Sequence, residues 1–227
     1  MNHLMMHIYP RVGGTWRDAV AEIRSRRSLF EGRRVAGVAL GEGLESRESV
    51  RDTLGDLFDS VTFVDNDPGL REVATFPLLI TSLRGVAGNV FYCHTKGSTH
   101  PAESICQEWR RLMFSVCLDY PALIDCSLRS HAIAGPCRRV GDMLSVPWHF
   151  SGAFYWLRAA AAWARNWGHI HQVWYGVESW PAVQFSIEES ACLFLDHCQD
   201  LYATDYWDRV VRPAFAVWRE RISKCTR

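Results

Sequence analysis

Short apolar runs alternate with stretches of helical periodicity through the first hundred residues of this chain. This alternation is typical of repeated βα units, in which each helix returns the chain to the same edge of a sheet. We predict strands over residues 5–9, 34–40, 61–64 and 89–93, and helices over 16–26, 49–58 (with Ser49 as N-cap) and 70–83. The sequence therefore predicts an α/β fold with a mostly parallel central sheet flanked by helices. Ligands of such sheets bind beyond the carboxyl ends of the strands.

The pattern changes from residue 101 onward, where longer helical stretches flank shorter apolar pieces. We predict helices over residues 103–117 and 158–167. A chain of 227 residues is near the upper end of what one hydrophobic core supports, and the sequence contains neither a linker nor an internal repeat. We therefore predict a single domain over residues 1–227, in which residues 101–227 elaborate the half formed by residues 1–100.

The charge balance and the apolar runs exclude several classes of partner. The 25 basic and 25 acidic side chains cancel, so the chain has no global field that would attract nucleic acid. No apolar run reaches the roughly 18 to 20 residues that span a bilayer, and the N-terminus lacks a signal-peptide pattern. We predict no membrane span and a cytoplasmic location. The eight cysteines are irregularly spaced, which favours reduced thiols.

The segment over residues 89–97 is an apolar strand that ends in His94, Thr95, Lys96 and Gly97. These residues bring a proton-transfer group, a hydroxyl, a cation and a flexible backbone to one strand end. Lysine supplies a point charge and glycine permits close backbone approach, so the set suits a phosphate-bearing ligand. An ordinary polar turn is the alternative, and it fits these residues equally well.

The same segment resembles the HTKG motif of a family of predicted bacterial and viral glycosyltransferases. Further segments that resemble this family follow in order: His7-Ile-Tyr-Pro10 with Trp16, Asn66 with Glu72-x-x-Thr75, Trp109-Arg110, His149-Phe-Ser-Gly152 with Tyr155-Trp156, Gly176-Val-Glu-Ser-Trp-Pro181, and Glu188-Glu189-Ser-Ala-Cys-Leu-Phe194. The order and spacing of these motifs are more specific than any one of them.

The resemblance implies a GT-A-like fold, the Rossmann-like architecture of nucleotide-diphospho-sugar transferases. In such a fold a nucleotide-binding half, here about residues 1–100, holds a nucleotide-diphosphate sugar as donor. The second half, about residues 101–227, holds the sugar and a carbohydrate or other hydroxyl acceptor. The expected activity is therefore that of a glycosyltransferase of the hexosyltransferase type.

One departure from the broader fold concerns the metal ion. Most GT-A enzymes carry Asp-x-Asp at the end of the fourth strand to hold a divalent cation on the diphosphate, whereas this chain has His94-Thr-Lys96 there. A fixed lysine neutralises developing phosphate charge much as a metal does. We expect Lys96 and His94 to bind or balance the diphosphate, with Thr95 and Gly97 beside them, and the need for a divalent metal stays open.

The sequence Asp65-Asn66-Asp67 also reads as Asp-x-Asp after an apolar run. It precedes the strand that normally carries the metal motif, so we interpret Asn66, with Asp65, as a nucleotide or ribose contact. A simple Asx-turn is the alternative, and for Asp67 it has at least equal weight.

The segment His149-Phe-Ser-Gly152 leads into the aromatic residues 154–156. Aromatic faces stack on sugar rings and hydroxyl groups bind sugar hydroxyls, so we expect Ser151, Gly152 and Trp156 to shape a sugar pocket. Aromatic packing in the core is the alternative, and we favour it for Phe154.

Two adjacent carboxylates, Glu188 and Glu189, precede the apolar run over residues 191–195, which predicts that they occupy the first turn of a helix. One of them is the expected general base that deprotonates the acceptor hydroxyl, and we favour Glu189. A purely structural role at the helix dipole is the alternative. Glu178 is a third candidate for the base.

Two other functions compete with a glycosyltransferase. The first is a non-catalytic protein of the same fold that binds a carbohydrate or a nucleotide, an interpretation that the absence of Asp-x-Asp keeps open. The second is a Cys/His metal-binding module built on His169-x-His171 and His197-Cys198. These pairs lack a Cys-x-x-Cys partner, which disfavours a structural zinc site.

Overall fold

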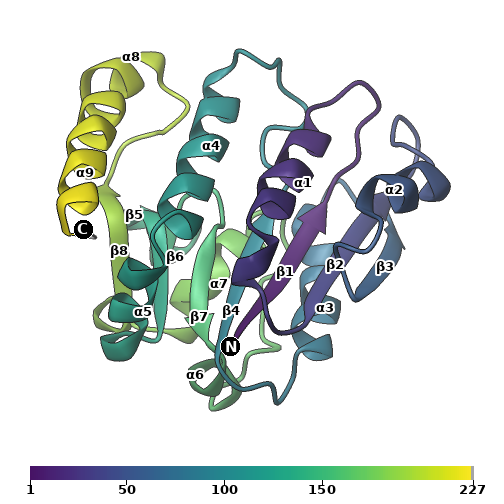
Figure 1. The fold of residues 1–227 in the computed structure, drawn as a ribbon, viewed down its shortest axis with the longest axis horizontal. Helices are drawn as coiled ribbons and strands as arrows, with labels where there is room; N and C mark the ends of the chain where they lie inside the picture. Colours follow the sequence, from purple (N-terminus) through teal and green to yellow (C-terminus); the bar gives the residue numbers. More distant parts are fainter. Residues whose placement is uncertain (226–227) are drawn as a thin grey trace.

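A computed structural model describes residues 1–225 and contains an eight-stranded mixed sheet with helices on both faces (Figure 1). The strands are β1 (Asn2–Ile8), β2 (Arg34–Leu40), β3 (Ser60–Asp65), β4 (Asn89–His94), β5 (Ile133–Met143), β6 (Val146–Phe150), β7 (Tyr155–Arg158) and β8 (Ser190–His197). The helices are α1 (Trp16–Ser25), α2 (Arg47–Leu54), α3 (Phe76–Ser82), α4 (Ile105–Leu118), α5 (Pro121–Ser130), α6 (Ala159–Trp163), α7 (Gly176–Gln184), α8 (Thr204–Tyr206) and α9 (Arg212–Cys225). Short helical turns are η1 (Arg27–Leu29), η2 (Arg71–Ala74), η3 (Ile187–Glu189) and η4 (Trp207–Val211).

The first half of the chain forms a parallel layer in the order β3-β2-β1-β4. Strands β1, β2 and β4 are largely buried on both faces, as their near-continuous apolar runs predict, whereas β3 at the edge of the sheet is only partly buried. Along β1, Leu4 and Met6 belong to one core with residues of α1 and α4, whereas Met5 belongs to a second core with residues of α3 and α7. The predicted α/β class, with a mainly parallel sheet flanked by helices, is confirmed.

The second half continues the sheet with mixed strand directions. Strand β7 pairs antiparallel with β4, and the long β5 pairs antiparallel with β7 and β6 and parallel with β8. In Figure 1, β8 and α9 lie at the edge of the sheet opposite β3. The change of sequence pattern at residue 101 thus coincides with the change from a parallel to a mixed sheet.

Several element boundaries differ from the sequence prediction. Ser46, rather than Ser49, caps α2, because its side chain accepts a hydrogen bond from the Ser49 backbone N–H at 3.2 Å. The helix predicted over 70–83 is divided into η2 and α3, since Pro77 has no N–H to donate and fits only the first turn of a helix. The helix predicted over 158–167 is limited to α6.

The apolar run over residues 191–195 forms β8, and the prediction of a helix there is wrong. A short apolar run fits a buried strand and a buried helix equally well by periodicity alone. The tertiary partner decides, because β8 completes its backbone hydrogen bonds against β5, with Ser190 opposite Ile133. Glu188 and Glu189 therefore lie in η3, a single turn that leads into a strand.

Two further observations concern the cysteines and the helices. Seven of the eight cysteines are described by the structure as free thiols. Within residues 1–225, no helix combines the length and the apolar character that a membrane crossing requires.

Candidate active site

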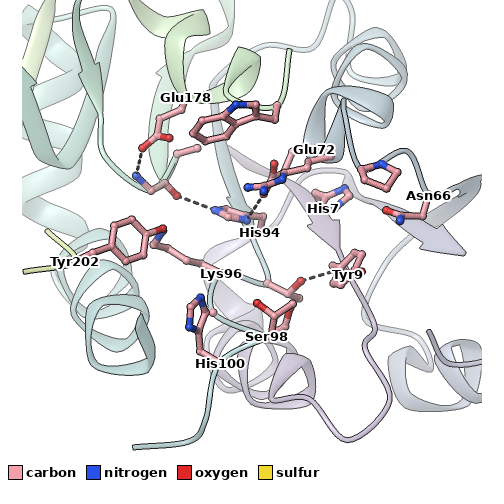
Figure 2. Close-up of a pocket in the computed structure, with 18 residues that line it drawn as sticks. His7, Tyr9, Asn66, Glu72, His94, Lys96, Ser98, His100, Glu178 and Tyr202 are labelled. Atoms are coloured by element: carbon pink, nitrogen blue, oxygen red, sulfur yellow. Dashed lines mark hydrogen bonds and ion pairs between the residues drawn. The ribbon is translucent and has the colours of Figure 1, made fainter. Parts of the chain in front are cut away.

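A pocket of about 420 Å³ opens beyond the carboxyl ends of β1 and β4 (Figure 2). Its walls come from the ends of β1, β3 and β4, from η2, from the turn before β7, from α7 and the segment before it, and from the loop after β8. Both halves of the chain therefore contribute side chains. The position is the one expected for a ligand site of a parallel sheet.

Strand pairing and hydrogen bonds hold the carboxyl ends of β1 and β4 together at the pocket. His7 and His94 are paired across the two strands. The Tyr9 backbone N–H donates to Oγ1 of Thr95 at 2.8 Å, and Nδ1 of His7 lies 2.7 Å from Oγ1 of Thr75. Burial lowers the pKa of His7 to about 4, although the nearby Glu72 opposes the shift, so His7 is a neutral part of the pocket wall at pH 7.

Three short contacts join both halves of the chain in one series (Figure 2). Nδ1 of His94 lies 2.9 Å from Oε1 of Glu72, and Nε2 of His94 lies 2.8 Å from the carbonyl oxygen of Gly152. The Gly152 backbone N–H donates to Oε1 of Glu178 at 2.6 Å. Gly152 is thus held through both its N–H and its carbonyl group.

The two partners of His94 occupy both of its ring nitrogens. Burial alone would raise the pKa of Glu72, but the charge of His94, their hydrogen bond and His7 outweigh burial and lower it to about 2. Glu72 is therefore ionised and can only accept, as can the carbonyl of Gly152. Both ring nitrogens of His94 are therefore engaged by acceptors of the protein. Neither nitrogen is left over for a ligand.

Lys96 is the cation of the HTKG segment that remains free for a ligand. Its Nζ lies 3.7 Å from the centroid of the Trp109 ring and donates to the hydroxyl of Tyr202 at 3.2 Å. Among the described residues no carboxylate lies within ion-pairing distance of this ammonium group, which has three protons to donate. Lys96 can therefore bind an anion without breaking an ion pair.

Arg110 fixes the backbone of Lys96. This guanidinium is 1% exposed and donates to the carbonyl oxygens of Thr15 at 3.1 Å and Lys96 at 3.3 Å. It also pairs with Asp18 at 3.3 Å. Arg110 thereby joins the loops that follow β1 and β4, which explains structurally why a Trp-Arg pair follows the HTKG segment.

Glu178 is the carboxylate of the pocket that has no cationic partner. Burial raises the pKa of Glu178, while the charge of Lys96 and the hydrogen bond from Gly152 limit the increase. Oε1 is bound to the Gly152 N–H, and within the described part of the chain Oε2 has no hydrogen-bond partner. A carboxylate with a raised proton affinity and a free oxygen is suited to take up a proton.

Six of the residues predicted for the site lie in this pocket: Asn66, His94, Thr95, Lys96, Gly97 and Gly152. The conformation of Gly152 explains the glycine, because its φ is 87° and an added Cβ would lie 2.8 Å from Sδ of Met113. Asp67 forms the Asx-turn, with Oδ1 accepting from the Gly69 N–H at 2.8 Å.

Three other predicted residues lie outside the pocket lining. Asp65 is exposed at the end of β3. Ser151 is 4% exposed, with its Oγ 3.4 Å from Nε2 of His149. Trp156 is 2% exposed and packs on Phe91 in the core, because alternation along β7 turns it to the face covered by α4. A stacking role of Trp156 on a sugar is incompatible with this burial.

The two glutamates predicted to supply the base also lie outside the pocket lining. Glu188 is exposed. Glu189 forms an ion pair with Arg165 and accepts a hydrogen bond from the Ser186 backbone N–H at 3.0 Å. These contacts stabilise the entry into β8, so Glu178 is the predicted candidate that the fold brings to the site.

Sequence reasoning did not single out several pocket residues, among them Arg71, Trp174 and Tyr202. Arg71 opens the turn η2, within the stretch predicted as a helix, and Trp174 and Tyr202 lie in loops. A weak signal existed for Arg71, which directly precedes Glu72 of the family-like segment, whereas Tyr202 reaches Lys96 only because the chain folds back after β8.

The residues in place of Asp-x-Asp do not fit a divalent cation. Lys96 has no lone pair when protonated, and both ring nitrogens of His94 are engaged. Among the side chains that the structure describes, no three from His, Cys, Asp or Glu form a group that could hold a metal ion, and this includes the predicted pairs at residues 169–171 and 197–198.

Comparison with known proteins reveals similarity in fold alone. No protein-family model matches the chain, and no curated protein matches it. Among solved structures, 4-diphosphocytidyl-2C-methyl-D-erythritolsynthase from Anaerococcus prevotii aligns over 96% of this chain and 99% of its own, with 9% identity and a TM-score of 0.48. HddC from Yersinia pseudotuberculosis aligns over 94% and 99%, with 10% identity and a TM-score of 0.43.

Proposed function

We propose that this chain transfers a sugar from a nucleotide-diphosphate sugar to a hydroxyl acceptor. The observation that carries the proposal is the presence of two complementary groups in one pocket at the strand ends. Lys96 is a cation without a carboxylate partner, and Glu178 is a carboxylate with a raised pKa and a free oxygen. A group transfer that expels a diphosphate and deprotonates a hydroxyl requires such a pair.

The donor half of the proposal rests on Lys96 and Asn66. Figure 2 shows them on different sides of His94, and Asn66 directly follows the end of β3. In this arrangement the diphosphate lies against Lys96, and the nucleoside extends toward Asn66. A lysine fixed by its neighbours stabilises the negative charge that develops on the leaving diphosphate.

The acceptor half of the proposal rests on Glu178. Its free oxygen takes the proton of the acceptor hydroxyl as the new glycosidic bond forms, while the bond between the sugar and the diphosphate breaks. The Gly152 N–H fixes the other oxygen, so the carboxylate is oriented before substrate arrives.

The test separates donor binding from transfer. Calorimetry with UDP, GDP, ADP and CDP should identify a nucleoside diphosphate that the wild-type protein binds. Transfer from the corresponding nucleotide sugars to a mixed acceptor pool is then followed by mass spectrometry. We expect Glu178→Gln to retain nucleotide affinity and to lose transfer by about a hundredfold or more.

Glu189→Gln is the matched control, because it removes a carboxylate that does not line the pocket. We expect this variant to transfer sugar at the wild-type rate. Nucleotide binding without transfer from any donor would favour a non-catalytic binding protein. Transfer at the wild-type rate by Glu178→Gln would assign the base elsewhere.

A further inference from the structure

Arg71 has a backbone conformation that residues with a side chain seldom adopt. Its φ is 50°, in the left-handed region where a Cβ is unfavourable. The turn before it holds this conformation, since the carbonyl oxygen of Asp67 accepts from the Arg71 N–H at 2.7 Å. Strained residues of this kind concentrate at functional sites, and Arg71 lines the pocket.

The guanidinium of Arg71 stacks on an aromatic ring and contacts no carboxylate. Its Cζ lies 5.0 Å from the centroid of Trp174, a half-exposed residue that also lines the pocket. Among the residues that the structure describes, none accepts a hydrogen bond from this guanidinium. The stack orients the planar group while leaving its N–H donors free.

The carboxylates of the pocket do not neutralise this cation. Glu72 is adjacent to Arg71 in sequence but is paired with His94, and Glu178 is bound to the Gly152 N–H. The contact between Glu72 and His94 also shows that η2 reaches the end of β4, the strand end that is followed by Lys96. One pocket therefore holds two cations whose donors are available, one from each of two strand-end segments.

We propose that Arg71 and Lys96 together form the binding site for the diphosphate of the donor, without a divalent cation. This inference rests on the proposed function and deepens it. Arginine presents a planar fork that binds two phosphate oxygens at once, and lysine adds a point charge. The two residues together provide the charge that Asp-x-Asp enzymes obtain from a metal ion.

The test uses inorganic pyrophosphate as the probe, titrated calorimetrically in the presence of EDTA. We expect the wild-type protein to bind it, and Arg71→Gln and Lys96→Ala each to weaken binding about ten- to a hundredfold. Arg71→Lys should recover only part of the loss, because it restores charge but not the fork. Each variant's melting temperature confirms that it is folded.

Arg84→Gln is the matched control. Arg84 is also exposed and stacks on a tryptophan, with its Cζ 5.9 Å from the centroid of Trp167, but neither residue lines the pocket. We expect this variant to bind pyrophosphate with wild-type affinity. An equal loss in Arg84→Gln and Arg71→Gln would reduce the effect to general surface charge and overturn the proposal.

Other outcomes separate this proposal from the proposed function. Wild-type affinity in Arg71→Gln, with affinity lost in Lys96→Ala, would remove Arg71 from the site and leave the transferase proposal standing. Binding that requires added Mg²⁺ would overturn the metal-free site alone. No binding of pyrophosphate or of any nucleoside diphosphate, with or without Mg²⁺, would overturn both.

Discussion

His94 illustrates how two hydrogen-bond partners fix the role of a residue. A histidine at a strand end is open to several roles by sequence, including general base and ligand of phosphate. The contacts with Glu72 and with the carbonyl of Gly152 engage both ring nitrogens. The ring then connects β4 to the turn before β7, and the role of meeting a ligand falls to its neighbours.

The pairing of Glu72 with His94 predicts a dependence of stability on acid pH. The pKa of Glu72 is lowered from 4.5 in the unfolded chain to about 2. The ion pair therefore stabilises the fold above about pH 4.5, and this stabilisation is lost as the pH falls toward 2, because the unfolded chain takes up the proton first. The free energy of unfolding, measured by urea denaturation, should fall by on the order of 2 to 3 kcal/mol over this range.

Glu72→Gln isolates this contribution. The variant should lack the Glu72 part of the decline below about pH 4.5. It should retain a decline between about pH 6.5 and 4, where the lowered pKa of His7 destabilises the fold. Glu31→Gln, which removes an exposed carboxylate, should behave as the wild type. An unchanged slope below pH 4.5 in Glu72→Gln would contradict the ion pair.

At the scale of elements, burial decides which strands the sequence can predict. Strands β1, β2 and β4 of the parallel half are covered on both faces and therefore read as apolar runs, and β2 has the predicted bounds of residues 34–40. Strand β8 was mistaken for a helix because its apolar run is short and its pairing with β5 joins residues that are far apart in the sequence. Local pattern cannot supply such a partner.

The same distinction between local pattern and tertiary contact explains which residues of the candidate site the sequence can predict. His94, Thr95, Lys96 and Gly97 directly follow or end a strand, so topology alone places them at the ligand-binding edge. The positions of Arg71, Trp174 and Tyr202 in the pocket depend on how loops of both halves fold over that edge, which no local pattern specifies. The position of Glu178 likewise depends on the tertiary contact with Gly152.

The ion pair just before β8 provides a prediction at the scale of elements. Glu189→Gln removes the ion pair with Arg165, whose side chain is 34% exposed, while the amide can still accept from the Ser186 N–H. Solvent weakens such pairs, so the free energy of unfolding should fall by no more than about 1 kcal/mol. Urea denaturation measures this loss, and the affinity for nucleoside diphosphates should stay unchanged. A large loss of affinity would place Glu189 in the site after all.

For the whole molecule, the two halves share their cores as well as their pocket. Strand β4 of the first half packs directly on β7 of the second, with the rings of Phe91 and Trp156 5.0 Å apart on one face and those of Tyr92 and Tyr155 5.3 Å apart on the other. Each hydrophobic core therefore needs both halves.

This sharing predicts that residues 1–100 do not fold alone. Expressed separately, they should give the narrow amide dispersion of an unfolded chain in a ¹H–¹⁵N spectrum, because both faces of β4 would lose their cover. Adding residues 101–227 in trans should restore dispersion if the two pieces reassemble. A well-dispersed spectrum of the first fragment alone would instead indicate two domains.

The antiparallel direction of β7 has a consequence for engineering. A parallel strand delivers to the pocket only the residues that follow it, but β7 runs against β4, so the residues that precede β7 reach the same edge. Insertions placed directly ahead of Gly152, between β6 and β7, would alter that wall without shifting the register of β1, β2, β3 and β4. A designer could therefore vary one wall of the pocket while the wall bearing Lys96 stays fixed.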